Sequence, residues 1–180
     1  MRKEIRFAGF GGQGIILAGH IAGLAAAVHD GKEAVFTQSY GPEARGGASA
    51  AELALDDQFI DYPLISQADV TAILSQEAYE KYIDAAKEGS IIILEEDLVD
   101  SPLQGKNIFR IPCTHLAEEL GRRIVANIVM LGAFTAAAGV ISKEAMKQAV
   151  SASVPPKTID LNMKAFDVGY EYVERQKEAS

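Results

Sequence analysis

The chain has 180 residues, of which 48% are hydrophobic and 23% are charged, with a formal net charge of −8. This size and composition are typical of one globular domain that buries its own core without disulfides or metals. Lys and Arg are scattered rather than gathered in a stripe, which argues against nucleic acid and against an anionic membrane as partners.

The first predicted elements are a strand, a glycine-rich turn and a helix. Residues 5–8 are typical of a short strand, and glycines interrupt the chain over residues 9–14. Residues 15–28 predict a helix that is apolar nearly all round, so we expect it to be buried. A second strand is expected at residues 34–38 and leads into another glycine-rich segment.

The middle of the chain continues this alternation. Strands are expected at residues 49–55 and 69–74. Residues 76–87 predict an amphipathic helix that Gly89 ends. The continuous apolar run at residues 91–94 is typical of a central strand in a covered sheet.

The last third is mostly helical after a strand at residues 107–111. Helices are expected at residues 114–120, 123–138 and 142–150. Beyond a break at Pro155-Pro156, a C-terminal helix carries an apolar stripe of Ile159, Met163, Phe166, Tyr170 and Val173. The stripe is too short for a coiled coil, so we expect it to dock on the core of this domain.

These elements predict an α/β fold: a Rossmann-like three-layer domain whose mostly parallel sheet is covered by helices on both faces. No repeat or linker divides the chain, so residues 1–180 are expected to form a single domain. The apolar stretch at residues 124–140 is short for a membrane span, and a buried helix is expected there. No signal-peptide core follows Met1, which favours a cytoplasmic location.

The glycine-rich turn has the G-x-G-x-x-G spacing of dinucleotide-binding loops. Its three glycines are Gly9, Gly11 and Gly14. The acidic residue that would hold a ribose is missing from the end of the second strand, and Asp30 and Glu33 lie before that strand. Three interpretations remain: a stand-alone NAD- or FAD-binding oxidoreductase, tight packing of strand on helix, or close approach of a partner chain.

A second glycine-rich loop covers residues 40–47. It lies at the same sheet edge as the first loop if the two preceding strands are parallel, and ligands of open α/β sheets gather at that edge. Arg45 could bind a carboxylate or phosphate through two hydrogen bonds. The alternative is a solvated pair of Glu43 and Arg45 on a surface turn, which contributes little to stability.

At these loops the sequence resembles a known family. Residues 9–15 and 39–47 are similar to signatures of the gamma subunits of 2-oxoacid:ferredoxin oxidoreductases, the pyruvate/ketoisovalerate oxidoreductase gamma-type domain. Residues 126–132 resemble a third signature of these subunits, and the similarity covers nearly the whole chain. The segment Ser39-Tyr40-Gly41-Pro42-Glu43 is most similar to the corresponding segment in the 2-oxoglutarate branch of the family.

The resemblance implies oxidative decarboxylation of a 2-oxoacid to an acyl-CoA, with electrons passing to ferredoxin. It implies thiamine diphosphate with Mg, iron–sulfur clusters and coenzyme A, all on partner subunits. The implied partners are alpha and beta subunits and a ferredoxin-like delta subunit or an external ferredoxin. This chain has no Gly-Asp-Gly segment for a diphosphate, and Cys113 alone cannot hold a cluster, so we expect no catalytic residue and no cofactor in it.

The residues expected to face partner subunits or their ligands come from the two loops. They are Gly9, Gly11, Gly12, Gln13, Gly14, Tyr40, Gly41, Pro42, Glu43, Arg45, Gly46 and Gly47. Asn127 is a second candidate, although a hydrogen bond within the domain is favoured because an unpaired buried amide is costly. Small residues over 132–139 predict close helix–sheet packing, and Cys113 is expected to be a structural thiol. The histidines lack metal-ligand spacing, so no metal site is expected.

Overall fold

The computed structural model describes residues 1–39 and 47–179, and within them the chain forms one six-stranded sheet. Its strands are β1 (Lys3–Phe10), β2 (Glu33–Ser39), β3 (Ala48–Asp56), β4 (Ala68–Ile73), β5 (Ala86–Glu95) and β6 (Ile108–Ile111). The order across the sheet is β2-β3-β1-β4-β5-β6. Only β3 runs against the other described strands, pairing antiparallel with both β1 and β2. The prediction of a mostly parallel sheet is confirmed.

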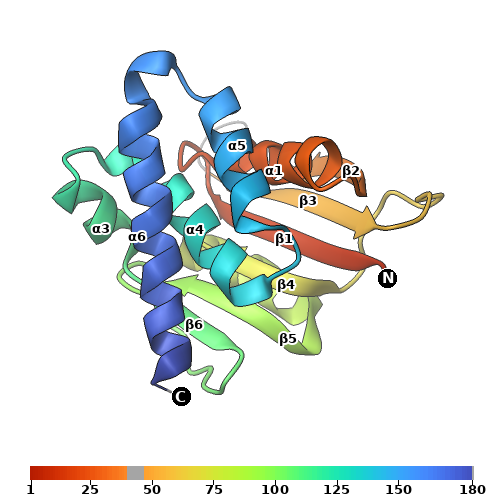
Figure 1. The fold of residues 1–180 in the computed structure, drawn as a ribbon. Coiled ribbons are helices and arrows are strands. Elements are labelled where there is room, and N and C mark those ends of the chain that lie inside the picture. The colour runs from red at the N-terminus through yellow and green to blue at the C-terminus, as the bar shows by residue number, and fades with distance from the viewer. Residues whose placement is uncertain (40–46, 180) are drawn as a thin grey trace.

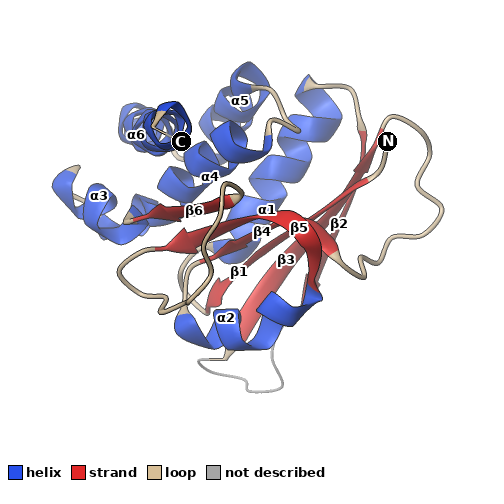
Figure 2. Cartoon of the chain, turned by 90° about the horizontal axis from the view of Figure 1, so that it is seen from below, coloured by secondary structure: helices blue, strands red, loops and turns tan. Residues whose placement is uncertain are grey.

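Helices cover the two faces of the sheet unequally. They are α1 (Ile15–Leu24), α2 (Gln76–Tyr82), α3 (Cys113–Glu119), α4 (Ala126–Ala138), α5 (Lys143–Ser153) and α6 (Ile159–Glu178). A π-helical turn, Ala25–His29, continues α1. Figures 1 and 2 show α2 alone on one face of the sheet, with the longer helices on the other. The predicted layers on both faces are therefore confirmed.

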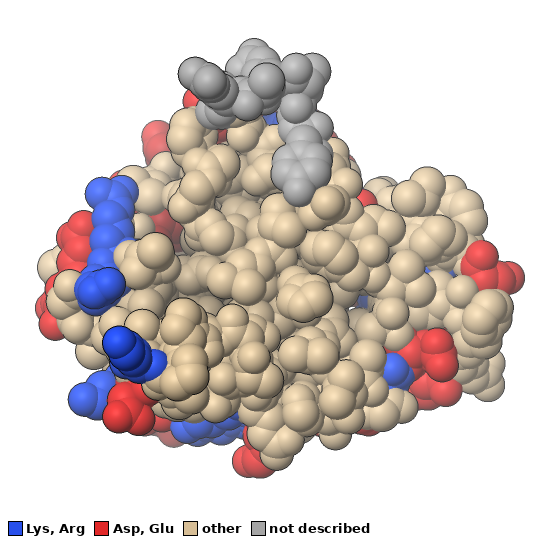
Figure 3. All heavy atoms as spheres, turned by 90° about the horizontal axis from the view of Figure 1, so that it is seen from above, with Lys and Arg blue, Asp and Glu red and all other residues tan. Residues whose placement is uncertain are grey.

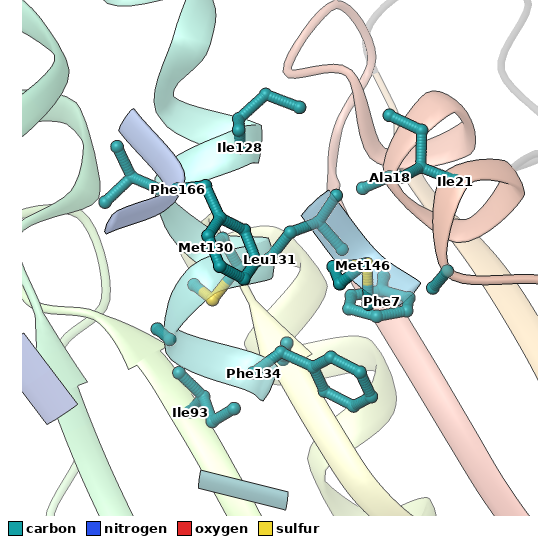
Figure 4. Packing of buried hydrophobic residues seen from close by; sticks show 14 of the residues in the cluster. Phe7, Ala18, Ile21, Ile93, Ile128, Met130, Leu131, Phe134, Met146 and Phe166 are labelled. Atoms are coloured by element: carbon teal, nitrogen blue, oxygen red, sulfur yellow. The ribbon is translucent and has the colours of Figure 1, made fainter. Parts of the chain in front are cut away.

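Two hydrophobic clusters lie on opposite faces of the sheet because successive residues of a strand point to opposite sides. Phe7 of β1 packs into the larger cluster, where its ring meets that of Phe134 edge to face at 5.0 Å between centroids. Figure 4 shows Leu131 and Phe134 of α4 beside Phe7 and Met146. The neighbouring Ala8 packs into the smaller cluster beneath α2.

The helix α4 is the centre of the larger cluster. Every residue from Asn127 to Ala137 is buried, which confirms the prediction of a buried helix in this segment. Among the residues that the structure describes, no helix combines the length and the apolar character needed to cross a membrane.

The predicted boundary after α2 is wrong. The helix was expected to run to Lys87 and end at Gly89, but α2 ends at Tyr82 and β5 begins at Ala86 after a short 3-10 turn. Gly89, with φ of 73°, lies inside β5, where the pairing of β4 with β5 shifts register. A left-handed glycine suits a bulge in a strand as well as the end of a helix, so the sequence signal was ambiguous.

The helices α4 and α6 touch through their backbones. A Cβ atom built on Gly132 would overlap the carbonyl oxygen of Phe166, and one built on Gly169 would overlap that of Val129. The expected close packing of the small residues is therefore present at Gly132, but its neighbour there is α6 rather than the sheet. Phe166 and Val173 of the predicted stripe are buried, which confirms that α6 docks on this domain.

Replacing Gly169 with alanine tests this backbone contact. Because carbonyl groups cannot move aside as a side chain can, we expect Gly169→Ala to lower the free energy of unfolding by about 3 kcal/mol, measured by urea denaturation. Gly23→Ala is the matched control, since its Cβ would meet only the side chain of Leu53 at 3.2 Å. The control should stay within about 1 kcal/mol of the wild type. Equal losses in the two variants would contradict the close crossing.

Candidate functional site

The two glycine-rich loops leave the sheet at one edge. Because β1 and β2 are both antiparallel to β3, they point the same way, and Ser39 at the end of β2 lies level with Ala50 and Ala8. The second loop rejoins the sheet where Ala48 pairs with Phe10, at the end of β1. Gly47 is half-buried there. The other predicted site residues of this loop lie outside the described residues: Tyr40, Gly41, Pro42, Glu43, Arg45 and Gly46.

The side chain of Gln13 holds the first loop against the sheet. Its Oε1 accepts a hydrogen bond from the Phe10 N–H at 2.6 Å, and its Nε2 donates to the Leu74 carbonyl at 2.9 Å. Gly9 leaves the space for this arrangement, because a Cβ there would lie 2.7 Å from Gln13 Oε1 and from Ile15 Cδ1. Gln13 and Gly9 therefore join the ends of β1 and β4, and both are engaged within the chain.

Gly14 connects the first loop to α4. Its φ of 74° is the left-handed conformation that glycine adopts most easily, and it caps the start of α1. Asn127, which is 4% exposed, donates from Nδ2 to the Gly14 carbonyl at 3.2 Å. A Cβ on Gly14 would lie only 2.5 Å from that nitrogen. The hydrogen bond expected for Asn127 within the domain is confirmed.

Gly11 and Gly12 differ from the other two glycines of the loop. Both are exposed, and a Cβ on either would have no neighbour within 4 Å among the described residues. Gly9 and Gly14 must be glycines because a side chain at either position would clash within the domain. This agrees with the interpretation that the glycines allow the strand and helix to pack tightly. Such packing does not explain Gly11, and Gly12 has φ of 94°, a left-handed conformation that favours glycine. Both residues leave bare backbone open to an approaching molecule.

Among the described residues, no acidic residue lies at the end of β2, where dinucleotide binding would require one. Asp30 lies before that strand and accepts hydrogen bonds from the backbone N–H and the hydroxyl of Ser142, each at 2.7 Å. Glu33 pairs with Asp56 at the opposite edge of the sheet. Both acids are therefore remote from the glycine turn, as the sequence predicted.

An exposed isoleucine separates two hollows beside the turn. Ile124 is 78% exposed, and it lines both a cavity of about 340 Å³ toward α6 and one of about 290 Å³ toward α3. Gly12 also borders both cavities, and Leu17, which is 41% exposed, borders the larger one. This feature is not predicted from the sequence, because the apolar run places Ile124 within a helix, whereas it lies in a 3-10 turn before α4.

A buried carboxylate, which was not predicted from the sequence, lies at the end of β5. Glu95 is fully buried and accepts hydrogen bonds from the Thr114 N–H at 2.9 Å, the Thr114 hydroxyl at 3.1 Å and the Asp97 N–H at 3.3 Å. Burial raises the pKa of Glu95 above its ordinary value of 4.5, against the lowering effect of these bonds. In sequence, Glu95-Glu96-Asp97 looks like a solvated acidic turn.

Cys113 is buried, and burial together with the charge of Glu95 raises the pKa of its thiol well above the ordinary value. A thiol in that state is a poor nucleophile, which agrees with the predicted structural role. As the single cysteine of the sequence, it also cannot supply the set of thiolates that an iron–sulfur cluster needs. Within residues 1–39 and 47–179, no group of three or more His, Cys, Asp or Glu side chains is placed to hold a metal ion.

Comparison with known proteins identifies the family of this fold. The model of the family "Pyruvate ferredoxin/flavodoxin oxidoreductase" matches residues 4–172. The 2-oxoglutarate synthase subunit KorC of Methanocaldococcus jannaschii is 54% identical over 175 residues, which cover 95% of this chain and 94% of the relative.

Two solved structures show the same fold. A keto/oxoacid ferredoxin oxidoreductase gamma subunit from Geobacter sulfurreducens PCA is 45% identical with a TM-score of 0.89, over 97% of this chain and 98% of that one. A 2-oxoglutarate:ferredoxin oxidoreductase from Magnetococcus marinus, with 2-oxoglutarate, coenzyme A and succinyl-CoA bound, matches with 26% identity and a TM-score of 0.85. That match covers 97% of this chain but 31% of the other.

A double-mutant cycle tests the contact of Gly14 with Asn127. Gly14→Ala should cost about 1–2 kcal/mol for the left-handed backbone, with the clash against Asn127 adding about 1–3 kcal/mol. In an Asn127→Ala background the clash disappears, so the two losses should not add.

Gly121→Ala is the matched control for this cycle, because Gly121 has φ of 94° and open space around it. Its loss should add to that of Asn127→Ala within about 0.5 kcal/mol. Free energies of unfolding from urea titrations give all the terms. Additive losses for Gly14→Ala and Asn127→Ala would show that the contact is absent.

The buried Glu95 should make stability depend on pH. Because its pKa is raised in the folded protein, the folded state binds the proton more tightly than the unfolded state. Relative to Glu95→Gln, the wild type should therefore gain stability as the pH falls through the raised pKa, and the gain should level off below the ordinary value of 4.5. Urea denaturation of both proteins between neutral and acid pH measures this. A difference that does not change with pH would contradict the assignment.

Proposed function

The chain belongs to the pyruvate ferredoxin/flavodoxin oxidoreductase family, and we propose that it is the gamma subunit of a 2-oxoglutarate:ferredoxin oxidoreductase. The observation that carries this proposal is the 54% identity to a 2-oxoglutarate synthase subunit over 94% of that relative's length. The gamma subunit from Geobacter sulfurreducens, of nearly the same length and fold, supports it independently.

In this proposal the reactive groups lie on other subunits. The reaction needs thiamine diphosphate to attack the 2-oxo carbon, clusters to carry electrons to ferredoxin, and coenzyme A to accept the acyl group. The residues of this chain do not fit a cluster, since the single thiol of Cys113 is buried. Glu95, the buried acid at the sheet edge, is already engaged by Thr114 and Asp97. We therefore assign no catalytic residue to the described part of the chain.

The role that fits this chain is docking onto the catalytic subunits. Alpha and beta subunits would hold the thiamine diphosphate with its Mg, and a ferredoxin-like delta subunit or an external ferredoxin would receive electrons in the cytoplasm. The edge carrying both glycine loops is the proposed contact. Gly11 and Gly12 support this, because their exposed backbone packs against none of the described residues. Gly47 and the undescribed part of its loop would complete the contact at the same edge.

Reconstitution tests the proposed function directly. The purified chain alone should not oxidise 2-oxoglutarate, and the partner subunits without it should be impaired. Mixing them should restore reduction of ferredoxin that depends on both 2-oxoglutarate and coenzyme A, followed by absorbance. The same mixture supplied with pyruvate or indolepyruvate is the control for substrate class and should be slower.

Two outcomes would contradict this function. One is turnover by the isolated chain, which would place the chemistry on this polypeptide. The other is full activity of the partner subunits without it, which would leave the chain no part in the enzyme.

A further inference from the structure

The larger hollow beside Ile124 has apolar walls and two buried amides. It lies between the glycine turn, the start of α4 and the start of α6, with a volume of about 340 Å³. Leu161 and Val154 contribute to its apolar wall. Asn127 and Asn162 also line it, and they are only 4% and 5% exposed.

The two amides have unused acceptors. Asn127 donates from Nδ2 to the Gly14 carbonyl at 3.2 Å, and Asn162 donates from Nδ2 to the Thr158 carbonyl at 2.8 Å. Neither amide oxygen accepts a hydrogen bond from any residue in the described ranges 1–39 and 47–179. Neither oxygen is among the fully enclosed unpaired atoms of the described residues, so a donor from outside can reach both, and the cavity is suited to an occupant that brings N–H groups.

The surroundings of the cavity favour a polypeptide over a small ligand. Leu17 and Ile124 stand at its rim, 41% and 78% exposed, and a small molecule inside the cavity would cover only the side of each that faces the cavity. Beyond Leu17, α1 and the π-helical turn after it continue without Lys, Arg, Asp or Glu, and Val28 in that turn is 64% exposed. Figure 3, which views the side where α6 begins, shows a broad surface with few charged side chains. Apolar surface of this kind is typical of contacts between subunits.

The charge at the rim indicates the character of the partner. Arg122 borders the larger cavity and Arg123 the smaller one, and both are exposed. Both are cationic on a chain whose net charge is −8, and Arg123 Nη1 lies 3.9 Å from the carboxylate of Glu118 in an exposed ion pair. A carboxylate on the partner is the complementary group, and such pairs set orientation and association rate.

We propose that this cavity holds an aliphatic side chain of a partner subunit. Backbone N–H groups beside that side chain donate to the amide oxygens of Asn127 and Asn162, and a nearby carboxylate pairs with Arg122 and Arg123. This inference rests on the proposed function, since it requires a multi-subunit enzyme. The Magnetococcus marinus structure supports a lasting interface, because there the same fold is about a third of a longer chain.

Three variants in the reconstituted complex test the proposal. Ile124→Asp places a charge on the rim, Val154→Trp fills the cavity, and Arg122→Glu with Arg123→Glu reverses the charge. Each should weaken binding to the partner subunits at least tenfold, and the loss from charge reversal should shrink at high salt. Phe59→Asp is the matched control, because Phe59 is 83% exposed in the loop between β3 and β4. Unfolding curves check that every variant is folded.

The outcomes distinguish failure of the proposed function from failure of the cavity proposal. If the wild-type chain fails to restore turnover to its partners, the proposed function is wrong. If it restores turnover and Val154→Trp binds as tightly as the wild type, only the cavity proposal is overturned. A small molecule that co-purifies with the isolated wild-type chain but not with Val154→Trp, detected by native mass spectrometry, would also overturn it. Tenfold losses in all three variants with an unchanged Phe59→Asp would support it.

Discussion

The direct contact between the backbones of α4 and α6 is the constraint on which the rest of the structure depends. At Gly132 and Gly169 neither helix has a side chain, so the two axes approach more closely than any other residue would permit. This crossing fixes α4 between the sheet and α6, with its residues from Asn127 to Ala137 all buried. It also fixes the start of α4 beside the first glycine loop, where Asn127 holds Gly14.

The glycine-rich loop shows how a familiar spacing can serve packing rather than a nucleotide. Two of its glycines make room for side chains of the same chain, Gly9 for Gln13 and Gly14 for Asn127. The amide groups of those two residues then hold the loop to the end of β4 and to α4. What is left for other molecules is the bare backbone of Gly11 and Gly12, of which Gly12 borders both hollows, and this suits a protein surface.

Periodicity predicted most of the fold because strands and helices alternate along the chain, and two strands pointing the same way were enough to bring both loops to one edge. It could not predict the direction of β3, which depends on pairing partners rather than on pattern. The predicted helix end at Gly89 was wrong because a left-handed glycine is compatible with both the end of a helix and a bulge in a strand. The contact of Asn127 with Gly14 joins residues 113 positions apart, and no local signal reveals it. The exposure of Ile124 could not be predicted, because a run of apolar residues does not show which of them faces water.

The position of Cys113 has a practical consequence for studies of the assembled enzyme. It is the one cysteine of the chain, and it lies buried with a thiol that resists deprotonation. Maleimide and methanethiosulfonate reagents react with thiolates in contact with solvent, so the folded protein should be silent toward them. A cysteine introduced at any exposed position would then carry a fluorophore, spin label or crosslinker without first removing the native residue. Distances between such labels and labels on partner subunits could then be measured to map which surfaces of this chain lie near its neighbours.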